Sequence, residues 1–228
     1  MKRMDIRTYN YKTTPYEHQL ETLSRSAHKN LFALFLEMGL GKSKILLDNA
    51  SILFEQGKIT GLLIVTPKGN LRNWDTHEIS KHLPDQIERN VLVWQPNHTQ
   101  QWTQDYEKMV KEDSDGVLNI FLVNVEAFAT VRACTFVEEF LVTHDVMMAV
   151  DESTTIKNPK AKRTKHLIKL APLADYRRIL TGFPITKAPL DLYSQCYFLS
   201  PNLLGFSSYY AFSARYAITQ ARRMGAHS

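Results

Sequence analysis

The stretch Leu31–Leu47, LFALFLEMGLGKSKILL, decides the fold of this chain. An apolar run breaks at a turn with two glycines, a lysine and a serine, and a second apolar run follows at once. A strand that ends in a glycine-rich loop and opens a helix directs several backbone N–H groups to one point. Glycine lets such a backbone approach a phosphate without a clashing Cβ atom. The stretch therefore predicts a phosphate-binding loop, formed by Met38, Gly39, Leu40, Gly41, Lys42, Ser43 and Lys44.

Two side chains of this loop carry the expected chemistry. Lys42 is expected to reach the β- and γ-phosphates of a nucleotide, and the Ser43 hydroxyl to complete the shell of a Mg²⁺ ion. The full pattern places a first glycine five residues before Gly41, but that position is Leu36. The alternative interpretation is a glycine-rich turn between strand and helix with an incidental lysine.

A second motif, VMMAVDESTT at Val146–Thr155, is an apolar strand that ends in two carboxylates. Open α/β sheets bind ligands at this end of their strands. Asp151 is expected to hold Mg²⁺ through water, and Glu152 to polarise the attacking water. A solvated acidic strand end is the alternative, but the pairing with a phosphate loop about 110 residues earlier is specific. Together the motifs predict an ATP–Mg²⁺ site with Lys42, Asp151 and Glu152 as catalytic residues.

Strand-like and helix-like segments alternate along the chain. Strands are expected at Leu31–Leu36, Leu62–Thr66, Val91–Trp94, Asn119–Val123, Val146–Val150 and Arg178–Thr181. Helices are expected at Pro15–His28, Lys44–Gln56, Asn70–His82, Thr99–Lys111, Val131–Val142, Lys160–Leu170, Pro189–Phe198 and Ser207–Arg223, with a turn at Asp113–Gly116. Continuously apolar strands favour an α/β fold with a mostly parallel central sheet and helices on both faces.

Composition excludes several classes of protein. The chain has 228 residues, 44% of them hydrophobic and 22% charged, and its apolar runs are far shorter than the roughly 20 residues of a membrane span. No secretory signal is expected, because the N-terminal residues have no apolar segment, and two isolated cysteines, Cys134 and Cys196, favour a reducing, intracellular setting without a zinc site. His18, His77, His82 and His166 show no metal-ligand spacing and are expected at the surface. Trp74, Trp94 and Trp102 are expected in the core rather than stacked on bases.

The net charge of +5 is concentrated in one segment. Between Lys157 and Arg178 lie eight basic residues, opposed only by Asp175. Such a field would attract a polyanion, although a solvated basic face is the plainer interpretation.

These motifs resemble the first RecA-like lobe of superfamily 2 helicases, and most closely the Snf2-like DNA translocases. The segment EMGLGKS at Glu37–Ser43 is almost letter for letter the ATP loop of that family, whose form also lacks the first glycine. PYEHQ at Pro15–Gln19 is similar to the segment that reads adenine, where the Gln19 amide offers both a donor and an acceptor. Further similar segments are Leu62–Trp74, Val123–Phe128, Val150–Lys165 and Arg177–Pro201, so the resemblance spans roughly residues 12 to 223.

The resemblance implies a RecA-like P-loop NTPase lobe over residues 1–205, with the adenine-reading segment near 12–30. Residues 206–228 would then be a helical extension toward a missing second RecA-like lobe, which supplies arginine fingers in this family. Thr181 and Gly182 would link the ATP state to movement of DNA-contacting loops. The implied nucleic-acid contacts, to duplex DNA rather than a single strand, are Pro67, Lys68, Asn124, Lys157, Lys160, Lys162 and Arg163.

Two departures from the family pattern concern this coupling. Ser153 and Thr154 replace the usual Ala-His, and Phe183 replaces a threonine. The leading expectation is an intracellular ATP hydrolase acting on DNA, in the cytoplasm or nucleoid, or in the host cytoplasm if phage-encoded, and poorly active as an isolated lobe. A nucleotide-gated binding module without turnover is the main alternative. A small P-loop kinase is another, but it leaves Gln19 unexplained.

Overall fold

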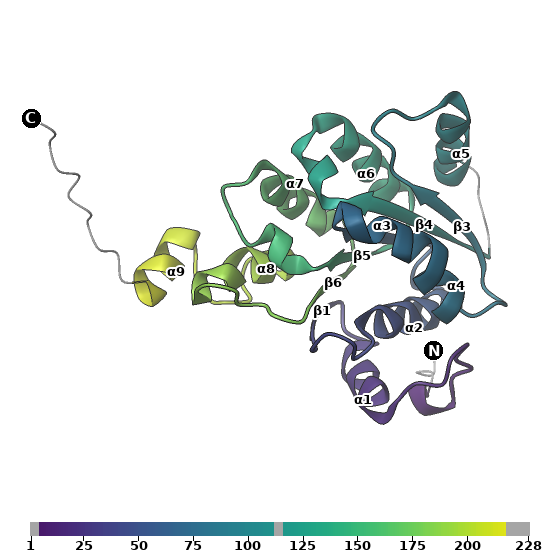
Figure 1. The fold of residues 1–228 in the computed structure, drawn as a ribbon, viewed down its shortest axis with the longest axis horizontal. Helices are drawn as coiled ribbons and strands as arrows, with labels where there is room; N and C mark the ends of the chain where they lie inside the picture. The colour runs from purple at the N-terminus through teal and green to yellow at the C-terminus, as the bar shows by residue number, and fades with distance from the viewer. Residues whose placement is uncertain (1–4, 112–115, 218–228) are drawn as a thin grey trace, which may run out of the picture.

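The protein is described by a computed structural model over residues 5–111 and 116–217. Its centre is a six-stranded sheet in the order β1–β6–β5–β2–β4–β3, in which every strand pair is parallel (Figure 1). The strands are β1 (Leu31–Phe35), β2 (Gly61–Thr66), β3 (Glu88–Val93), β4 (Val117–Asn124), β5 (Val146–Asp151) and β6 (Tyr176–Thr181). All six expected strands are present, and the predicted α/β class is confirmed.

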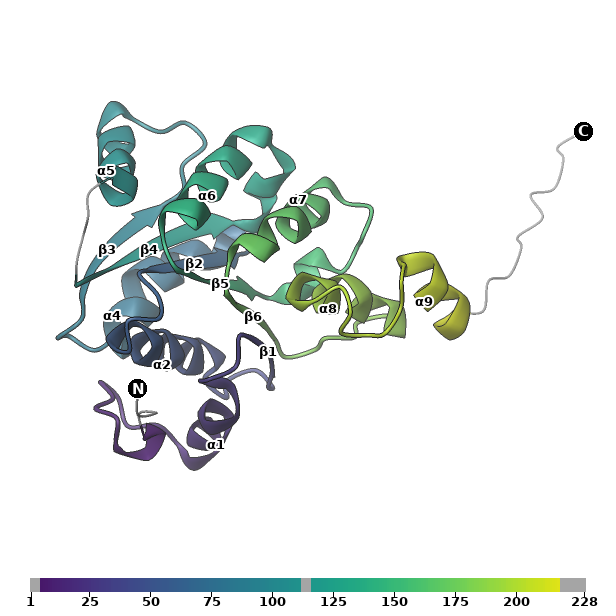
Figure 2. The same ribbon diagram turned by 180° about the vertical axis from the view of Figure 1, so that it is seen from behind.

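Helices cover both faces of the sheet (Figures 1 and 2). One face packs against α5 (Gln100–Lys111), α6 (Val131–Thr143), α7 (Lys162–Leu170) and α8 (Leu192–Leu199). The other packs against α1 (Glu17–Ser26), α2 (Lys42–Glu55), and the continuous helical stretch made of α3 (Leu71–Asn73), a wide turn at Trp74–Glu78 and α4 (Ile79–His82). Because β2, β4 and β5 are buried on both sides, their apolar runs show no alternation.

Two sequence expectations fall at the limits of the described chain. The last helix, α9 (Tyr209–Tyr216), is capped by the Ser208 hydroxyl and is shorter than predicted, because the backbone of Ala217 is already extended. Residues 218–228 lie outside the described part of the chain, as do three residues of the turn predicted at Asp113–Gly116. The prediction for the tryptophans is confirmed, since Trp74, Trp94 and Trp102 are all buried.

The sheet places the two motifs at one edge. All carboxyl ends of parallel strands lie on the same side, and only β6 separates β1, which leads into the phosphate loop, from β5, which ends at Asp151. In register, Phe35 of β1 pairs with Thr181 of β6. Loops that are far apart in the sequence therefore meet at this edge.

Arg178 of β6 is the least expected member of the core. It was expected to contribute to a basic surface, but its side chain is completely buried. Two of its N–H groups donate to Asn49 Oδ1 on α2, at 3.0 and 2.9 Å. The others donate to main-chain carbonyls, including those of Ser26, Lys29 and Asn30 at 2.7–3.1 Å. Burial lowers the pKa of Arg178 to about 10, so the group stays charged at pH 7.

Arg178→Leu is therefore expected to lower the free energy of unfolding by about 3 kcal/mol or more, because several buried acceptors lose their donor together. Chemical denaturation monitored by circular dichroism measures this change. The matched control is Lys165→Ala on α7, an exposed cation whose loss should change stability by less than about 0.5 kcal/mol. An Arg178→Leu variant as stable as the unaltered chain would contradict this interpretation of the buried guanidinium.

Candidate nucleotide site

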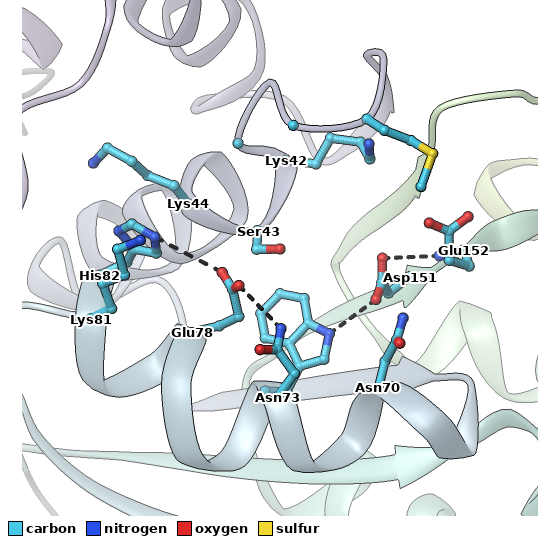
Figure 3. A pocket seen from close by; sticks show the side chains of 14 residues that line it. Lys42, Ser43, Lys44, Asn70, Asn73, Glu78, Lys81, His82, Asp151 and Glu152 are labelled. Atoms are coloured by element: carbon cyan, nitrogen blue, oxygen red, sulfur yellow. Dashed lines mark hydrogen bonds and ion pairs between the residues drawn. The ribbon is translucent and has the colours of Figure 1, made fainter.

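A cavity of about 410 Å³ lies at the carboxyl edge of the sheet, between the phosphate loop and the helical stretch that follows β2 (Figure 3). Both predicted motifs line it. The residues that they contribute are Met38, Gly39, Gly41, Lys42, Ser43, Lys44, Asp151 and Glu152. The structure thus brings together side chains that are more than 100 residues apart in the sequence.

The phosphate loop needs both of its glycines. Gly39 and Gly41 have φ values of +81° and +78°, in the left-handed region that favours glycine. A Cβ atom on Gly41 would lie 2.3 Å from Gln19 Nε2, so a side chain there would displace Gln19. Gly41 is also the N-cap of α2 and makes no side-chain cap bond, which leaves the first N–H groups of the helix directed at the cavity.

The Lys42 ammonium lies folded over the same loop. It donates to the carbonyl oxygens of Leu36 at 3.0 Å and Glu37 at 3.2 Å. Both acceptors are neutral, so a phosphate that enters the loop offers the ammonium a stronger partner.

Asp151 is held by three hydrogen bonds. Its Oδ2 accepts from the Thr66 hydroxyl at 2.9 Å and from the Trp74 indole N–H at 3.0 Å, and its Oδ1 accepts from the Glu152 backbone N–H at 3.0 Å. Thr66 and Trp74 were not predicted as site residues. The available signal was that Thr66 ends β2, the neighbour of β5, so its side chain had to lie at the same edge.

Glu152 has a strained backbone. Its φ of 47° and ψ of 58° make it the one non-glycine residue with positive φ in residues 5–111 and 116–217. Such a conformation costs on the order of 1–3 kcal/mol and persists only where its surroundings impose it. Burial, followed by the charge of Asp151, raises the pKa of the Glu152 carboxyl, while the Lys42 ammonium and the Thr181 hydroxyl oppose the rise.

The oxygen atoms at this edge fit a magnesium ion bound together with a nucleotide. No cluster of three or more histidine, cysteine or acidic side chains in the described residues could hold a metal alone. Mg²⁺, however, prefers hard oxygen ligands and is commonly held by one or two protein groups together with substrate phosphates. Ser43 and Asp151 line the same cavity and supply a hydroxyl and a carboxylate.

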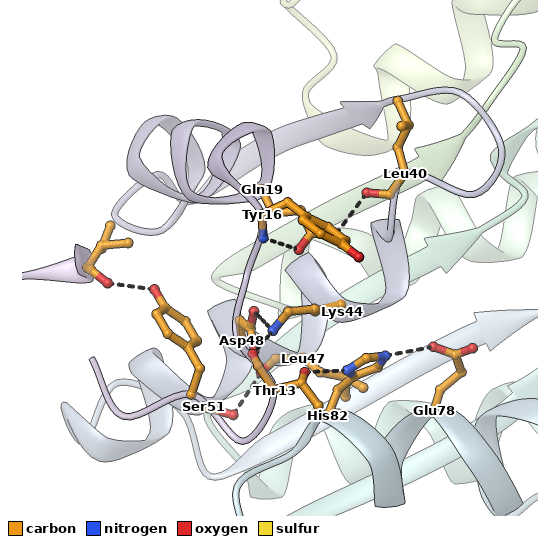
Figure 4. Close-up of polar contacts among 12 residues, drawn as sticks. Thr13, Tyr16, Gln19, Leu40, Lys44, Leu47, Asp48, Ser51, Glu78 and His82 are labelled. Carbon is orange, nitrogen blue, oxygen red and sulfur yellow. Dashed lines mark hydrogen bonds and ion pairs between the residues drawn. The ribbon is translucent and has the colours of Figure 1, made fainter. Parts of the chain in front are cut away.

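Gln19 lies against the phosphate loop, but its amide bonds within the chain (Figure 4). Its Oε1 accepts from the Tyr16 N–H at 3.0 Å, and its Nε2 donates to the Leu40 carbonyl at 3.2 Å. An amide has two donor hydrogens and two acceptor lone pairs, so one of each remains for a base. The predicted contact with adenine therefore stays a prediction.

Lys44 turns away from the phosphates that it was expected to bind. Its ammonium pairs with Asp48 at 2.8 Å and donates to the Thr13 carbonyl at 2.7 Å (Figure 4). Its side chain is almost fully buried there, so only its backbone N–H, in the first turn of α2, remains for a phosphate. Burial raises the pKa of Asp48 to about 6, although the Lys44 ammonium opposes the shift.

The surface position predicted for His82 is wrong. Its ring is buried at the outer end of the cavity, where Nδ1 hydrogen-bonds the Thr13 hydroxyl at 2.9 Å and Glu78 lies 3.9 Å from Nε2. Burial lowers the pKa of His82 to about 4, so the ring is neutral at pH 7. The helical period puts His82 on the inner side of α4, a position that residue type alone did not reveal.

Thr181 and Gly182 adjoin both motifs. Thr181 ends β6 and is buried, and its hydroxyl, which lowers the pKa of the Glu152 carboxyl, accepts from the Phe183 N–H at 3.3 Å. A Cβ atom on Gly182 would lie 3.4 Å from the backbone nitrogen of Met38, so the two loops are packed closely.

The predicted nucleic-acid residues fall into two groups. Lys68 and Asn124 line a second cavity of about 330 Å³, and Pro67 directly precedes Lys68. Arg132 lines the same cavity and was missed by the sequence analysis. A lone arginine at the start of α6 carries no sequence signal. Its guanidinium donates to the Pro96 carbonyl at 3.2 Å.

The second group is the basic segment, which is less uniform than its sequence suggests. Lys157 hydrogen-bonds the Thr186 hydroxyl and lies 3.6 Å from Asp191, and Arg163 donates to the Thr155 carbonyl at 3.1 Å. With Arg178 buried, the exposed cations of the segment are Lys160, Lys162, Lys165 and Lys169.

Comparison with known proteins identifies a family. The model of the SNF2-related domain matches residues 18–226. Relatives include the chromatin-remodeling ATPase INO80 of Lodderomyces elongisporus, 29% identical over 89% of this chain, and the ATP-dependent helicase fft2 of Schizosaccharomyces pombe, 30% identical over 73% of it. The chain spans only 12% of either relative's length.

Solved structures agree with this result. The Sulfolobus solfataricus SWI2/SNF2 ATPase core in complex with dsDNA matches with a TM-score of 0.70 and 25% identity, over 95% of this chain and 41% of that one. The UvsW helicase of bacteriophage T4 matches with a TM-score of 0.55 and 14% identity, over 80% of this chain and 57% of that one, and supports the fold alone. Within the described residues, no helix is both long and apolar enough to cross a bilayer.

Proposed function

The chain belongs to the SNF2-related domain family, as its N-terminal helicase lobe, and we propose that it is the ATP-binding and hydrolysing lobe of a DNA-dependent motor. One observation carries the proposal: Lys42, Ser43, Asp151 and Glu152 line a single cavity at the carboxyl edge of the sheet. Each supplies a group that phosphoryl transfer needs, namely a cation, a metal-binding hydroxyl, a metal-binding carboxylate and a base.

In this mechanism the triphosphate occupies the loop between Gly39 and Ser43, where the N–H groups of α2 hold it. The Lys42 ammonium leaves the carbonyls of Leu36 and Glu37 for the β- and γ-phosphates. Ser43 and Asp151 would hold Mg²⁺, which would neutralise charge on the phosphate oxygens when bound. Glu152 orients the attacking water and accepts its proton.

Among the described residues no arginine lines the cavity, and its further cations are two lysines, Lys81 and Lys44, of which Lys44 pairs with Asp48. Arg132, Arg163 and Arg178 all donate to groups of this chain away from the cavity. In other nucleotide hydrolases an arginine finger contributes roughly 10³–10⁵ in rate. We therefore propose that a second RecA-like lobe completes the site, and that this lobe alone binds ATP weakly and hydrolyses it slowly.

An assay of steady-state ATP hydrolysis by this chain, with and without duplex DNA, tests the proposal. A slow rate is expected, because no arginine of residues 5–111 and 116–217 lines the cavity. A rate on the order of 1–10² s⁻¹, which is typical of complete phosphoryl-transfer enzymes, would show that no second lobe is needed.

The proposed nucleic-acid ligand is duplex DNA, bound through its phosphates. Lys68 and Asn124 would contribute at the second cavity, and Lys160 and Lys162 from the exposed part of the basic segment. Arg132 is added to this set by its position in the same cavity. The Sulfolobus core was solved in complex with dsDNA, which supports a duplex over a single strand.

Raising the salt concentration fourfold is expected to weaken duplex binding about 40-fold if three phosphates are contacted, because bound counterions are released. Fluorescence anisotropy with a labelled duplex at 50 and 200 mM salt measures this. Lys160→Ala combined with Lys162→Ala should reduce the slope of log affinity against log salt concentration by about two. Lys169→Ala, which changes an exposed lysine further along α7, should leave this slope unchanged. An affinity that does not respond to salt would exclude phosphate contacts.

The alternative, a nucleotide-gated binding module without turnover, is not favoured. It needs no base beside the phosphates, whereas Glu152 occupies that position in a strained conformation. We also propose an intracellular location, which fits the relatives named as chromatin-remodeling proteins.

A further inference from the structure

A buried polar side chain on α8 lies behind the catalytic carboxylates. Gln195 is completely buried, and so is the serine that directly follows Glu152, Ser153. The Ser153 hydroxyl donates to Gln195 Oε1 at 2.7 Å. A buried amide is unfavourable unless its hydrogen bonds are made, so this pair requires an explanation beyond packing.

The other end of the Gln195 amide holds the loop 182–191, between β6 and α8. Its Nε2 donates to the Pro184 carbonyl at 2.8 Å and to the Asp191 carbonyl at 2.7 Å. Both amide hydrogens are therefore used on this loop, while the oxygen is used on Ser153. The Gln195 amide thus joins the segment after β5, which contains Glu152 and Ser153, to the loop that follows β6.

The loop has a second attachment on the Glu152 side, and it is also bonded within itself. Lys157, five residues after Glu152, hydrogen-bonds the Thr186 hydroxyl and lies 3.6 Å from Asp191. At the far end the Asp191 carboxylate accepts from the Thr186 N–H and hydroxyl at 2.9 and 2.7 Å, and from the Lys187 N–H at 2.8 Å. The loop is therefore stiff within itself and fixed to the Glu152 region at two points.

The outer surface of this loop is apolar. Phe183 and Ile185 are 63% and 46% exposed, although the Pro184 carbonyl between them is held by Gln195. A displacement of Glu152 would thus reach a solvent-facing apolar surface through two hydrogen-bonded groups, without passing through a flexible segment.

We propose that Gln195 is a positioning residue that joins Ser153 to the loop 182–191, so that Glu152 and this loop move as one unit when a nucleotide occupies the site. Ser153 stands where the resembled family has alanine, so this pair is a feature of this chain. The inference rests on the proposed function, because it requires that a nucleotide binds beside Glu152. It assigns Gln195 no contact with the substrate.

Hydrogen exchange of backbone amides in the loop, measured by mass spectrometry without nucleotide, with Mg·ADP and with Mg·AMP-PNP, tests the proposal. In the unaltered chain, AMP-PNP is expected to slow exchange in the loop at least about threefold more than ADP, because only its γ-phosphate reaches Glu152. In Gln195→Leu, AMP-PNP should bind within about threefold of the unaltered affinity, but the difference between the two nucleotides should vanish.

Two further variants separate this role from a structural one. Ser194→Ala is the matched control, since Ser194 is equally buried on α8 but its hydroxyl has no hydrogen-bond partner among the residues that the structure describes. It should keep the nucleotide response. Ser153→Ala combined with Gln195→Leu removes both partners and should recover folding stability, but not the response. This double variant carries the test if Gln195→Leu alone does not fold.

The outcomes distinguish the inference from the function on which it rests. AMP-PNP binding together with an unaltered loop response in Gln195→Leu or in the double variant would overturn the inference alone. So would a loop that does not respond in the unaltered chain. If the unaltered chain does not bind AMP-PNP at all, the proposed function fails and the inference fails with it.

Discussion

Lys42→Ala is expected to weaken binding of Mg·ATP at least about 100-fold. In the described chain, Lys42 is the lysine whose ammonium lies at the phosphate loop, where it donates to the carbonyls of Leu36 and Glu37. Charge-assisted hydrogen bonds to a phosphate contribute roughly 1.5–3 kcal/mol each, and 1.4 kcal/mol is a factor of ten in affinity. Titration with a fluorescent ATP analogue measures the change.

The control for this variant is Lys58→Ala. Lys58 is an exposed lysine just beyond the opposite end of α2, so its loss changes the net charge equally without touching the loop. Its affinity for the analogue should match that of the unaltered chain. Equal affinities for Lys42→Ala and Lys58→Ala would mean that the nucleotide does not occupy this loop.

Glu152→Gln is expected to keep nucleotide binding and to slow hydrolysis at least about 100-fold. A glutamine has nearly the same shape but cannot accept the proton of the attacking water, and a positioned base contributes typically 10²–10⁴ in rate. Single-turnover hydrolysis with protein in excess over labelled ATP makes even a slow lobe measurable. Glu138→Gln, an exposed glutamate on α6, should hydrolyse ATP at the unaltered rate.

The pH dependence of ATP hydrolysis tests the role of Glu152 as a base in a second way. A base must be deprotonated, and burial raises the pKa of Glu152 above its ordinary value of 4.5. Hydrolysis should therefore fall as the pH drops through this raised value, at a higher pH than for a solvated glutamate. The acid limb should be absent from the residual activity of Glu152→Gln, and an unchanged limb in that variant would assign the titration to another group.

Most of the fold could be predicted because local sequence patterns indicate each of its strands and helices. Each strand is an apolar run of about six residues with a turn or helix signal on either side, and the continuous rather than alternating pattern indicates burial on both faces. The phosphate loop could also be predicted, because its backbone needs positive φ at two positions and the sequence has glycine at both.

The partners of the site residues could not be predicted, since they depend on which strands and helices become neighbours. Trp74 was recognised as a core residue, but its bond to Asp151 across 77 positions follows only from the packing of the helix after β2. The sequence places Lys44 among the phosphate-binding residues of the loop. In the structure its ammonium instead pairs with Asp48, one helical turn away, and donates to the Thr13 carbonyl.

Arg178 illustrates the limit of charge counting. In the sequence it belongs to a basic run, yet strand β6 directs it inward to carbonyls at the end of α1. Ser153 posed a different problem, because its departure from the family pattern was visible but its partner, Gln195, was not. That pairing joins residues 42 positions apart, and no local pattern in the chain indicates it.

The most direct test is a crystal structure of this chain with Mn²⁺ and AMP-PNP, in which the anomalous signal of manganese locates the ion independently of the nucleotide. The ion should lie between the Ser43 hydroxyl and the Asp151 carboxylate, with the γ-phosphate on the Lys42 ammonium and facing Glu152. An ion or triphosphate bound outside the cavity that these four residues line would contradict the assignment of a shared ATP–metal site.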